Sequence, residues 1–258
     1  MSDVDWAQVF DRSFTEQSRS TRQRVWREVY GHDYAEHAEP YSYVSRTELE
    51  QFAEHLRIGP SDTFVDLGGG RGGPGLLVAL RTGARLIGLD ISAVALADAE
   101  QRAEKFGLGS RAEFRKGGFA ATGLGDGCVQ AVMSVDALTF APDKQQALTE
   151  MARILAPGGR LVFTSWDYER TPDNRPPQVQ DHRPLLERAG FDVLAYQETT
   201  DWKHRWQATS RGMIARRDEL VEELGEERAD TTIAELQRQL DHQLPLATRR
   251  VLVVATRR

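Results

Sequence analysis

Three groups of residues in this chain have the types and the spacing to bind a nucleotide-like ligand. A glycine-dense turn, Gly68 to Gly75, follows the β-favouring residues 63–67 and precedes an apolar helical stretch. Glycine permits φ above zero and lets the backbone approach a ligand without a Cβ between them. Asp90 follows Gly68 by 90 − 68 = 22 positions, near the roughly 20-residue offset at which an acid meets ribose hydroxyls. The third group, 118–120 and Asp136, follows two later strand-like segments.

Alternating strands and helices would bring these residues to one edge of a sheet. The segments predicted as strands are 63–67, 85–90, 113–116, 129–135 and 160–165, and the helical segments among them are 76–80, 92–106 and 145–155. Such alternation indicates a parallel, doubly wound sheet. Ligands of these sheets bind at the carboxyl ends of the strands, where the glycine turn, Asp90 and Asp136 all fall.

Helical segments flank this core on both sides. Residues 1–62 carry aromatic residues at helical spacing and a capping box, Ser45 with Glu48, and are expected to form an N-terminal helical lid. Residues 63–200 would form the core, 201–248 a helical cap inserted before the last strand, and 249–258 that strand. The insertion begins basic and turns acidic, which fits either a solvated helix pair or a cap with arginines available to an anionic group.

The composition narrows the class of protein. The 258 residues have a net charge of -6, so no global basic field would recruit nucleic acid. The single Cys128 fits a reducing compartment, and the sequence shows no signal peptide and no apolar run of bilayer length. We therefore expect a soluble cytoplasmic protein, a monomer or homodimer, whose partner is a small molecule and not nucleic acid or a membrane.

The glycine turn by itself fits two families. Gly68-x-Gly70-x-x-Gly73 matches the dinucleotide fingerprint of dehydrogenases, whereas Asp66-x-Gly68-x-Gly70-x-Gly72 matches a second pattern. The turn lies some 60 residues into the chain, later than in many dehydrogenases, and the chain contains no Tyr-x-x-x-Lys pair, the base of short-chain dehydrogenases. These observations favour the second pattern.

In the order of its motifs, the stretch from about 56 to 166 resembles the class I S-adenosylmethionine-dependent methyltransferases. The motifs that carry the resemblance are Val65-Asp66-Leu67-Gly68-Gly69-Gly70-Arg71-Gly72, Gly88-Leu89-Asp90-Ile91-Ser92, Val132-Met133-Ser134-Val135-Asp136-Ala137 and Ile154-Leu155-Ala156-Pro157-Gly158-Gly159-Arg160-Leu161-Val162. The resemblance implies an α/β fold with a doubly wound, Rossmann-like sheet of seven mostly parallel strands. Residues 191–196 and 250–255 would supply the last two strands.

The resemblance also implies which residues would contact S-adenosylmethionine. Asp90 would bind the ribose hydroxyls, and Gly118-Phe119-Ala120 stands where related small-molecule enzymes often have Gly-Asp-Ala. Without that acid, adenine recognition would rest on backbone groups and on Phe119 as an apolar or stacking wall. By looser analogy, Ser45 would close over the cofactor. The full set of expected cofactor residues is Gly68, Gly69, Gly70, Asp90, Ile91, Gly118, Phe119, Val135, Asp136 and Ser45.

The residues expected at the acceptor are less closely tied to motifs. Substrate contacts are expected from Tyr34, Tyr41, Trp166 and Tyr168. An alcohol acceptor needs a general base, and His182 or Asp167 is the expected one because both lie near the predicted mouth of the site. No metal is expected, since His32 and His37 lack a convincing third ligand.

The predicted function is methyl transfer from S-adenosylmethionine to O, N or C of a small molecule, in specialised, natural-product metabolism. One alternative keeps the fold and the cofactor but uses them for a cyclase or pericyclase reaction, because fold does not fix function. A nicotinamide-dependent oxidoreductase and a non-catalytic binding module are the further alternatives.

Overall fold

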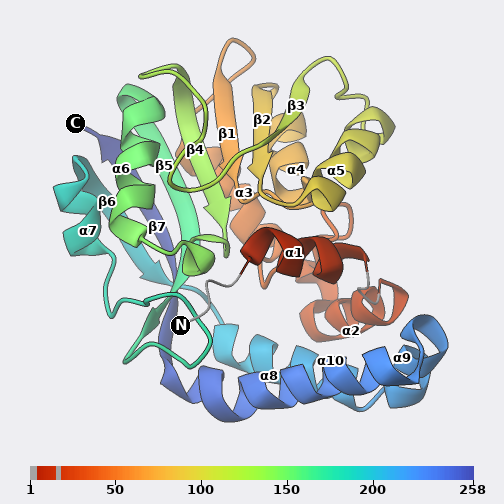
Figure 1. The fold of residues 1–258 in the computed structure, drawn as a ribbon. Coiled ribbons are helices and arrows are strands. Elements are labelled where there is room, and N and C mark those ends of the chain that lie inside the picture. The colour runs from red at the N-terminus through yellow and green to blue at the C-terminus, as the bar shows by residue number, and fades with distance from the viewer. Residues whose placement is uncertain (1–4, 16–18) are drawn as a thin grey trace.

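A seven-stranded sheet forms the centre of the computed structural model, which describes residues 5–15 and 19–258 (Figure 1). Its strands are β1 (Thr63–Leu67), β2 (Arg85–Asp90), β3 (Ala112–Lys116), β4 (Val129–Val135), β5 (Leu155–Tyr168), β6 (Phe191–Glu198) and β7 (Ala247–Arg257). They lie in the order β3-β2-β1-β4-β5-β7-β6. Strands β1 to β5 pair in parallel, and β7 runs antiparallel to β5 and β6. The predicted fold class is confirmed.

Helices cover both faces of the sheet. They are α3 (Arg46–Leu56), α4 (Gly73–Thr82) and α5 (Ala93–Lys105) on one face and α6 (Lys144–Ile154) and α7 (Arg183–Arg188) on the other. Successive strand residues point to opposite faces, so Phe64 packs with α3 and α4 whereas Val65 packs with α6. This double cover explains why the parallel strands are apolar throughout and not alternating.

The remaining helices form a second layer beyond the carboxyl ends of β1, β2 and β4 (Figure 1). They are α1 (Trp6–Thr15), α2 (Ser20–Tyr30), α8 (Trp202–Ile214), α9 (Arg217–Leu224) and α10 (Glu226–Arg238). Val25 and Trp26 of α2 pack with Met213 of α8, where Gly212 lets the helices approach because a Cβ there would lie 2.8 Å from Val25. The N-terminal helices and the insertion are therefore joined to each other, although the exact division of the chain into lid, core and cap stays a prediction.

Short helical turns connect these elements. They are η1 (Gly31–Asp33), η2 (Leu138–Phe140), the π-helical turn η3 (Gln239–Gln243) and η4 (Leu244–Leu246). The capping box is present as predicted, since Ser45 Oγ accepts from the Glu48 N–H and the Glu48 carboxylate accepts from the Ser45 N–H. Strand β5 is longer than the predicted 160–165, because residues 166–168 keep pairing with β7.

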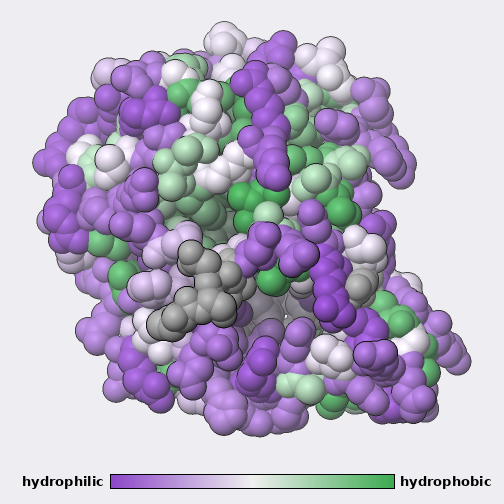
Figure 2. Space-filling model, in the orientation of Figure 1, coloured by the Kyte–Doolittle hydropathy of each residue, from purple (hydrophilic) through white to green (hydrophobic). Residues whose placement is uncertain are grey.

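Within the described ranges, no helix is both long and apolar enough to cross a bilayer. The face of the molecule in Figure 2 is mostly hydrophilic, with hydrophobic residues gathered near its centre above α1.

Candidate active site

A cavity of about 620 Å³ lies between the carboxyl ends of the strands and the helical layer. Its floor is the glycine turn after β1 and the residues that follow β2, β3 and β4. One face of α1, with residues at positions i, i+4, i+7 and i+8, forms part of its roof: Trp6, Phe10, Ser13 and Phe14. Residues of α2, α8 and α10 complete the wall. The volume is that of an ordinary small-molecule site.

The glycine turn is shaped so that its backbone borders the cavity. Gly68 and Gly70 have φ of +74° and +52°, values that residues with a side chain rarely adopt. A Cβ on Gly68 would lie 2.5 Å from the Cβ of Ala137 and 3.3 Å from the ring of Phe119. Glycine at position 68 therefore lets the turn pack closely against Ala137 and Phe119 while its backbone borders the cavity.

Asp90 lies beside the turn at the end of β2. Its Oδ2 accepts from the Gly70 N–H at 2.8 Å, and its Oδ1 accepts from the Ser92 N–H at 2.9 Å. Burial raises the pKa of Asp90, although these backbone donors oppose the shift. Each carboxylate oxygen keeps a lone pair for a further donor, as two neighbouring hydroxyls would supply.

Asp66 lies below the same turn and is fully buried. Burial, together with the negative charge of Asp90, raises the pKa of Asp66 to about 7. A Cβ on Gly75 would lie 2.6 Å from Asp66 Oδ2, so the carboxyl packs tightly against the start of α4. This acid shapes the turn from below.

An apolar wall follows β2 and β3. Ile91, Gly118 and Phe119 line the cavity, and the Gly118 N–H and C=O both bond to Ala121. Since the backbone of Gly118 is occupied in this way, the side chains of Ile91 and Phe119 provide the flat, apolar surfaces here.

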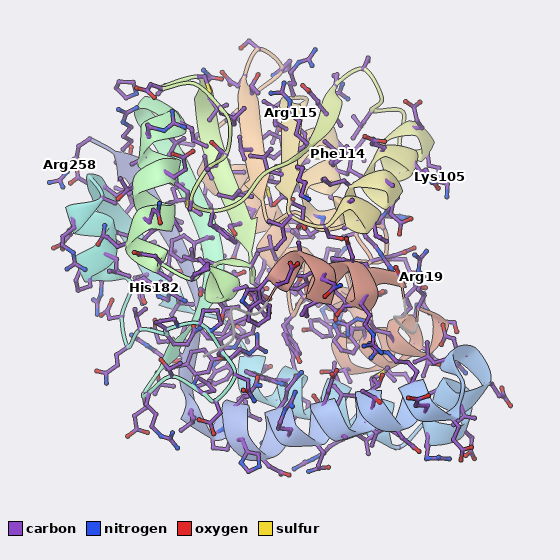
Figure 3. All side chains as sticks on the ribbon, viewed as in Figure 1. Arg19, Lys105, Phe114, Arg115, His182 and Arg258 are labelled. Carbon is purple, nitrogen blue, oxygen red and sulfur yellow. The ribbon has the colours of Figure 1, made fainter. Side chains whose placement is uncertain are left out.

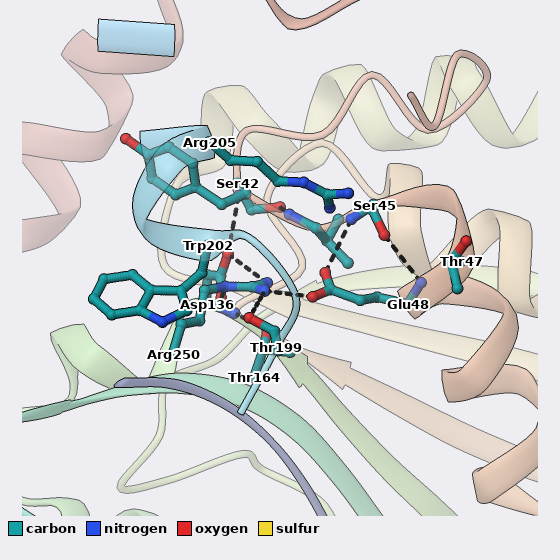
Figure 4. Close-up of polar contacts among 12 residues, drawn as sticks. Ser42, Ser45, Thr47, Glu48, Asp136, Thr164, Thr199, Trp202, Arg205 and Arg250 are labelled. Atoms are coloured by element: carbon teal, nitrogen blue, oxygen red, sulfur yellow. Dashed lines mark hydrogen bonds and ion pairs between the residues drawn. The ribbon is translucent and has the colours of Figure 1, made fainter. Parts of the chain in front are cut away.

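After β4, a buried ion-pair network fixes Asp136, which lines the cavity with Val135 (Figure 4). Arg250 of β7 donates Nε to Asp136 Oδ1 at 3.0 Å and Nη2 to Oδ2 at 3.1 Å, and its Nη1 donates to Glu48 at 2.7 Å. Burial alone would lower the pKa of Arg250, but the carboxylates of Asp136 and Glu48 outweigh it and raise that pKa. Asp136 Oδ2 also accepts from the Tyr43 N–H at 2.9 Å, which ties the 40–45 loop to the core.

Aromatic side chains form the part of the cavity beyond Asp136. Tyr43, Trp166 and Trp206 contact one another with ring centroids 5.5 to 5.8 Å apart. The expected substrate residues Tyr41, Trp166 and Tyr168 also line the cavity, Tyr41 on the side of Phe14. Tyr34 does not, because it packs in the cluster of α2 and α9.

Three other residues expected at the site, Ser45, Asp167 and His182, do not line the cavity. Ser45 is buried at the start of α3, where its hydroxyl caps the helix, whereas residues 38–43 of the preceding loop reach the cavity. Asp167 and His182 are brought together, with Nδ1 3.0 Å from Oδ1, but they lie on the opposite face of the sheet from Trp166. Figure 3 shows His182 on the side of α6 and α7.

The Asp167–His182 pair is enclosed by its own partners. Tyr196 donates to Asp167 Oδ1 at 2.6 Å, and Arg249 lies 2.7 Å from Oδ2. Both members of the pair are fully buried, and neither lines the cavity. This geometry does not support the expectation that one of them is the general base.

Several cavity residues were not expected from the sequence. They come from α1, α8 and α10 and from two arginines: Trp6, Phe10, Trp206, Met213, Thr232, Leu236, Arg22 and Arg175. The helical spacing of Trp202, Trp206 and Met213 was visible but indicates core packing equally well. The arginines of the insertion that the sequence offered to an anion are instead paired within the chain, Arg205 with Asp33 and Arg216 with Glu28.

Within the described residues, no group of three metal-ligating side chains comes together.

Comparison with known proteins identifies the family. Residues 65–163 match the family model described as "Methyltransferase domain". With the relatives and structures below, this match supports a class I S-adenosylmethionine-dependent methyltransferase.

Relatives and solved structures agree with this assignment. The methyltransferase is 28% identical to methyltransferase GfsG of Streptomyces halstedii over 205 residues, 73% of each chain. The sterol methyltransferases that also match are longer, and the chain spans less than half of each. Its fold matches the [4+2]-cyclase SpnF with a TM-score of 0.76 at 18% identity, over 98% of this chain and 94% of that one.

A geranyl diphosphate C-methyltransferase from Streptomyces coelicolor A3(2), solved with S-adenosyl-L-homocysteine, gives a TM-score of 0.70 at 18% identity over the full length of both chains. At 18% sequence identity, these structural similarities show a shared fold and no more. The methyltransferase uses S-adenosylmethionine, and the cavity has what that cofactor requires: a glycine turn free of side chains, a carboxylate with lone pairs to spare at Asp90, and apolar walls at Ile91 and Phe119.

Proposed function

We propose that this enzyme methylates O, N or C of a largely apolar small molecule in the specialised metabolism of the cytoplasm. One observation supports this most directly. A single cavity joins the glycine turn and Asp90 to a chamber walled by Tyr43, Trp166 and Trp206. A cofactor at one end would therefore face an acceptor at the other without a barrier between them.

The residues at the floor of the cavity would hold the cofactor. Gly68, Gly69 and Gly70 would border its methionine and sugar, and Asp90 would accept from both ribose hydroxyls, a contact that neutral residues make less well. Ile91 and Phe119 would enclose the adenine, with Gly118 beneath it. Val135 and Asp136 would face the methionine end.

Arg22 would meet the carboxylate of the cofactor. It stacks on Tyr41 with Cζ 4.7 Å from the ring centre, and Tyr41 contacts Phe14, which lies against Gly70. These contacts lead from Arg22 to the glycine turn. Burial lowers the pKa of Arg22, a shift that a bound anion would oppose.

When bound, the cofactor supplies an electrophilic methyl group on a sulfonium. The chain would contribute mainly position, because an in-line displacement depends on holding the two reacting atoms close and aligned. In the described part of the chain no histidine lines the cavity. Burial raises the pKa of both Tyr43 and Tyr168 to about 12, so these phenols stay protonated and shape the chamber without acting as bases at neutral pH.

A cyclase that keeps the cofactor without consuming it is the second candidate. The observation that favours it is the absence of a histidine from the described cavity wall, together with the full-length likeness in fold to SpnF. A pericyclic reaction needs a shaped, apolar chamber more than it needs a base.

Two measurements test the proposal. Calorimetry with S-adenosylmethionine and S-adenosylhomocysteine should show binding, and incubation with extracted metabolites should yield S-adenosylhomocysteine and a product heavier by one methylene. Conversion of a metabolite without release of S-adenosylhomocysteine would favour the cyclase. Absence of cofactor binding would reject both.

A further inference from the structure

Arg175 places a positive charge in the acceptor chamber. It belongs to the loop that follows β5, and its guanidinium lines the cavity with Cζ 4.6 Å from the ring centre of Phe140. Its Nη2 donates to the neutral Oε1 of Gln243 at 3.0 Å. Among the residues that the structure describes, Arg175 has no carboxylate partner.

The surroundings of Arg175 do not neutralise it. Burial lowers its pKa, and the positive charge of Arg238 does so further, whereas the phenols of Tyr168 and Tyr43 act in the opposite direction. Lys144 is close enough that the charge of Arg175, after burial, helps to lower its pKa to about 8. A partly buried cation beside the buried Lys144 is costly unless an anion completes the site.

Two hydrogen-bond donors in the same chamber also lack a partner, so they too favour an anionic or oxygen-rich ligand. Trp166 and Trp206 are 6% and 4% exposed, both line the cavity, and neither indole N–H has a hydrogen-bond partner among the described residues. A buried donor without a partner destabilises the protein, and a ligand that accepts from it removes that cost. The chamber therefore offers a guanidinium and indole N–H groups, and its complement is a group of acceptor oxygens.

The topology puts this charge on the acceptor side. The sheet order places the end of β5 beyond β4, away from β1 and β2. Tyr168 is the last residue of β5, and among the neighbouring tyrosines it has the largest effect on the pKa of Arg175. Arg22, by contrast, stacks on Trp26 and Tyr41, and Tyr41 contacts Phe14 beside the glycine turn. The two arginines thus belong to different ends of the cavity.

We propose that the acceptor carries an oxyanion, a carboxylate or a phosphate, on an apolar body, and that Arg175 binds it in the chamber of Trp166, Tyr168 and Trp206. The inference rests on the proposed function, since it names the class of acceptor for that cavity. The aromatic walls hold the body, and the stacked guanidinium presents its planar donors to the oxygens.

Matched probes with the same apolar chain test this proposal. Protein saturated with S-adenosylhomocysteine is titrated by calorimetry with octanoate, octyl phosphate and octanol. We expect at least one of the two anions to bind about tenfold more tightly than octanol, with the advantage falling at high ionic strength. A tighter octyl phosphate indicates a phosphate acceptor, and a tighter octanoate indicates a carboxylate.

Three variants separate the roles of the arginines. Arg175→Met keeps the bulk of the side chain and should bring the anions to within about twofold of octanol while S-adenosylhomocysteine binding persists. Arg22→Met should weaken S-adenosylhomocysteine but keep the preference for an anion. Arg81→Met, at an exposed residue of α4 paired with Glu50, is the control that should change neither.

The proposal is overturned if octanol binds the wild type as tightly as the anions, if no probe binds, or if Arg175→Met keeps the preference. Those results leave cofactor binding intact, so they do not touch the proposed function. Failure of the wild type to bind S-adenosylhomocysteine would instead reject the function itself. If Arg175→Met is unstable, the dependence of the wild-type preference on ionic strength still decides.

Discussion

Arg250 and Asp136 form a two-point ion pair inside the protein, with Nε to Oδ1 at 3.0 Å and Nη2 to Oδ2 at 3.1 Å. Arg250 is 1% exposed and Asp136 is 6% exposed. Asp136 also has a φ of +55°, a conformation that costs energy for a residue with a side chain. The ion pair holds this residue in place where β4 meets the cavity, so the last strand of the chain supports the site built by the first ones.

Replacing Arg250 by Met should lower the free energy of unfolding strongly. The change leaves the carboxylates of Asp136 and Glu48 buried without their cation, which typically costs about 3–5 kcal/mol. We expect urea unfolding to show a loss of that order. Arg81→Met, which removes an exposed ion pair with Glu50, should cost much less. Equal losses in the two variants would contradict the role assigned to Arg250.

Gly68→Ala should prevent cofactor binding. The new Cβ would lie 2.5 Å from the Cβ of Ala137, and the residue would keep a φ of +74°. Gly123→Ala is the matched control, since Gly123 has a φ of +73° but nothing within 4 Å of the added Cβ. Both variants should lose about 1 kcal/mol of stability to backbone strain, and Gly68→Ala should lose more because the clash displaces the turn. Calorimetry should show lost S-adenosylhomocysteine binding only for Gly68→Ala. Equal binding by the two variants would argue against the glycine turn as the cofactor site.

Asp90→Asn should weaken S-adenosylhomocysteine binding by about tenfold to a hundredfold, because a hydrogen bond to a charged group contributes roughly 1.5–3 kcal/mol. Competition with adenosine and with its deoxygenated analogues, which lack one ribose hydroxyl, shows whether the loss arises at the ribose. The exposed Asp192→Asn serves as control. If Asp90→Asn binds like the wild type, Asp90 does not meet the ribose.

The stability of the cofactor-free protein should depend on pH through Asp66. Its pKa is raised from 3.8 when unfolded to about 7 when folded, so the folded state binds this proton more tightly. The stabilisation is complete below pH 4 and is lost as the pH rises toward 7. Relative to Asp66→Asn, the wild type should lose up to about 1.4 kcal/mol per pH unit in that window. Urea unfolding of both proteins at several pH values checks the slope, and parallel curves would exclude this role.

His182→Gln should destabilise the protein without slowing the reaction. His182 lies against Asp167 and Tyr196 and is fully buried away from the cavity, so its loss should cost about 1–3 kcal/mol. With the acceptor found by metabolite screening, kcat should stay within about twofold of wild type below the unfolding temperature. A large fall in kcat in the folded variant would restore His182 as a candidate base.

The core of this protein could be predicted from local patterns. The strands β1, β2 and β4, the capping box at Ser45 and the glycine turn depend on residues close in sequence, and all lie where the sequence placed them. The succession of the four motifs along the chain indicated both the family and, through it, the order of the strands. Asp90, Ile91 and Phe119 were expected at the site for the same reason, and they line the cavity.

The acceptor side could not be predicted in this way. Arg250 pairs with Asp136 across 114 positions, and Arg205 pairs with Asp33 across 172. Patterns of neighbouring residues do not reveal pairs so far apart in the sequence. Trp206 and Phe10 follow helical spacing, which indicates a buried face but does not say whether protein or ligand covers it. His182 follows β5 in sequence, yet its hydrogen-bond partner Asp167 lies on the opposite face of the sheet from Trp166, because successive side chains of a strand alternate.

Hydrogen bonds through Ser92 connect α1, which forms part of the cavity roof, to Asp90. Ser92 donates its hydroxyl to Asp11 of α1 at 2.6 Å and its backbone N–H to Asp90. A ligand that engages Asp90 therefore acts on the group that fastens α1 to the core. By thermodynamic reciprocity, whatever tightens α1 must also tighten the cofactor, and to the same extent. A cofactor on Asp90 and an acceptor that contacts α1 should accordingly each bind more tightly when the other is present.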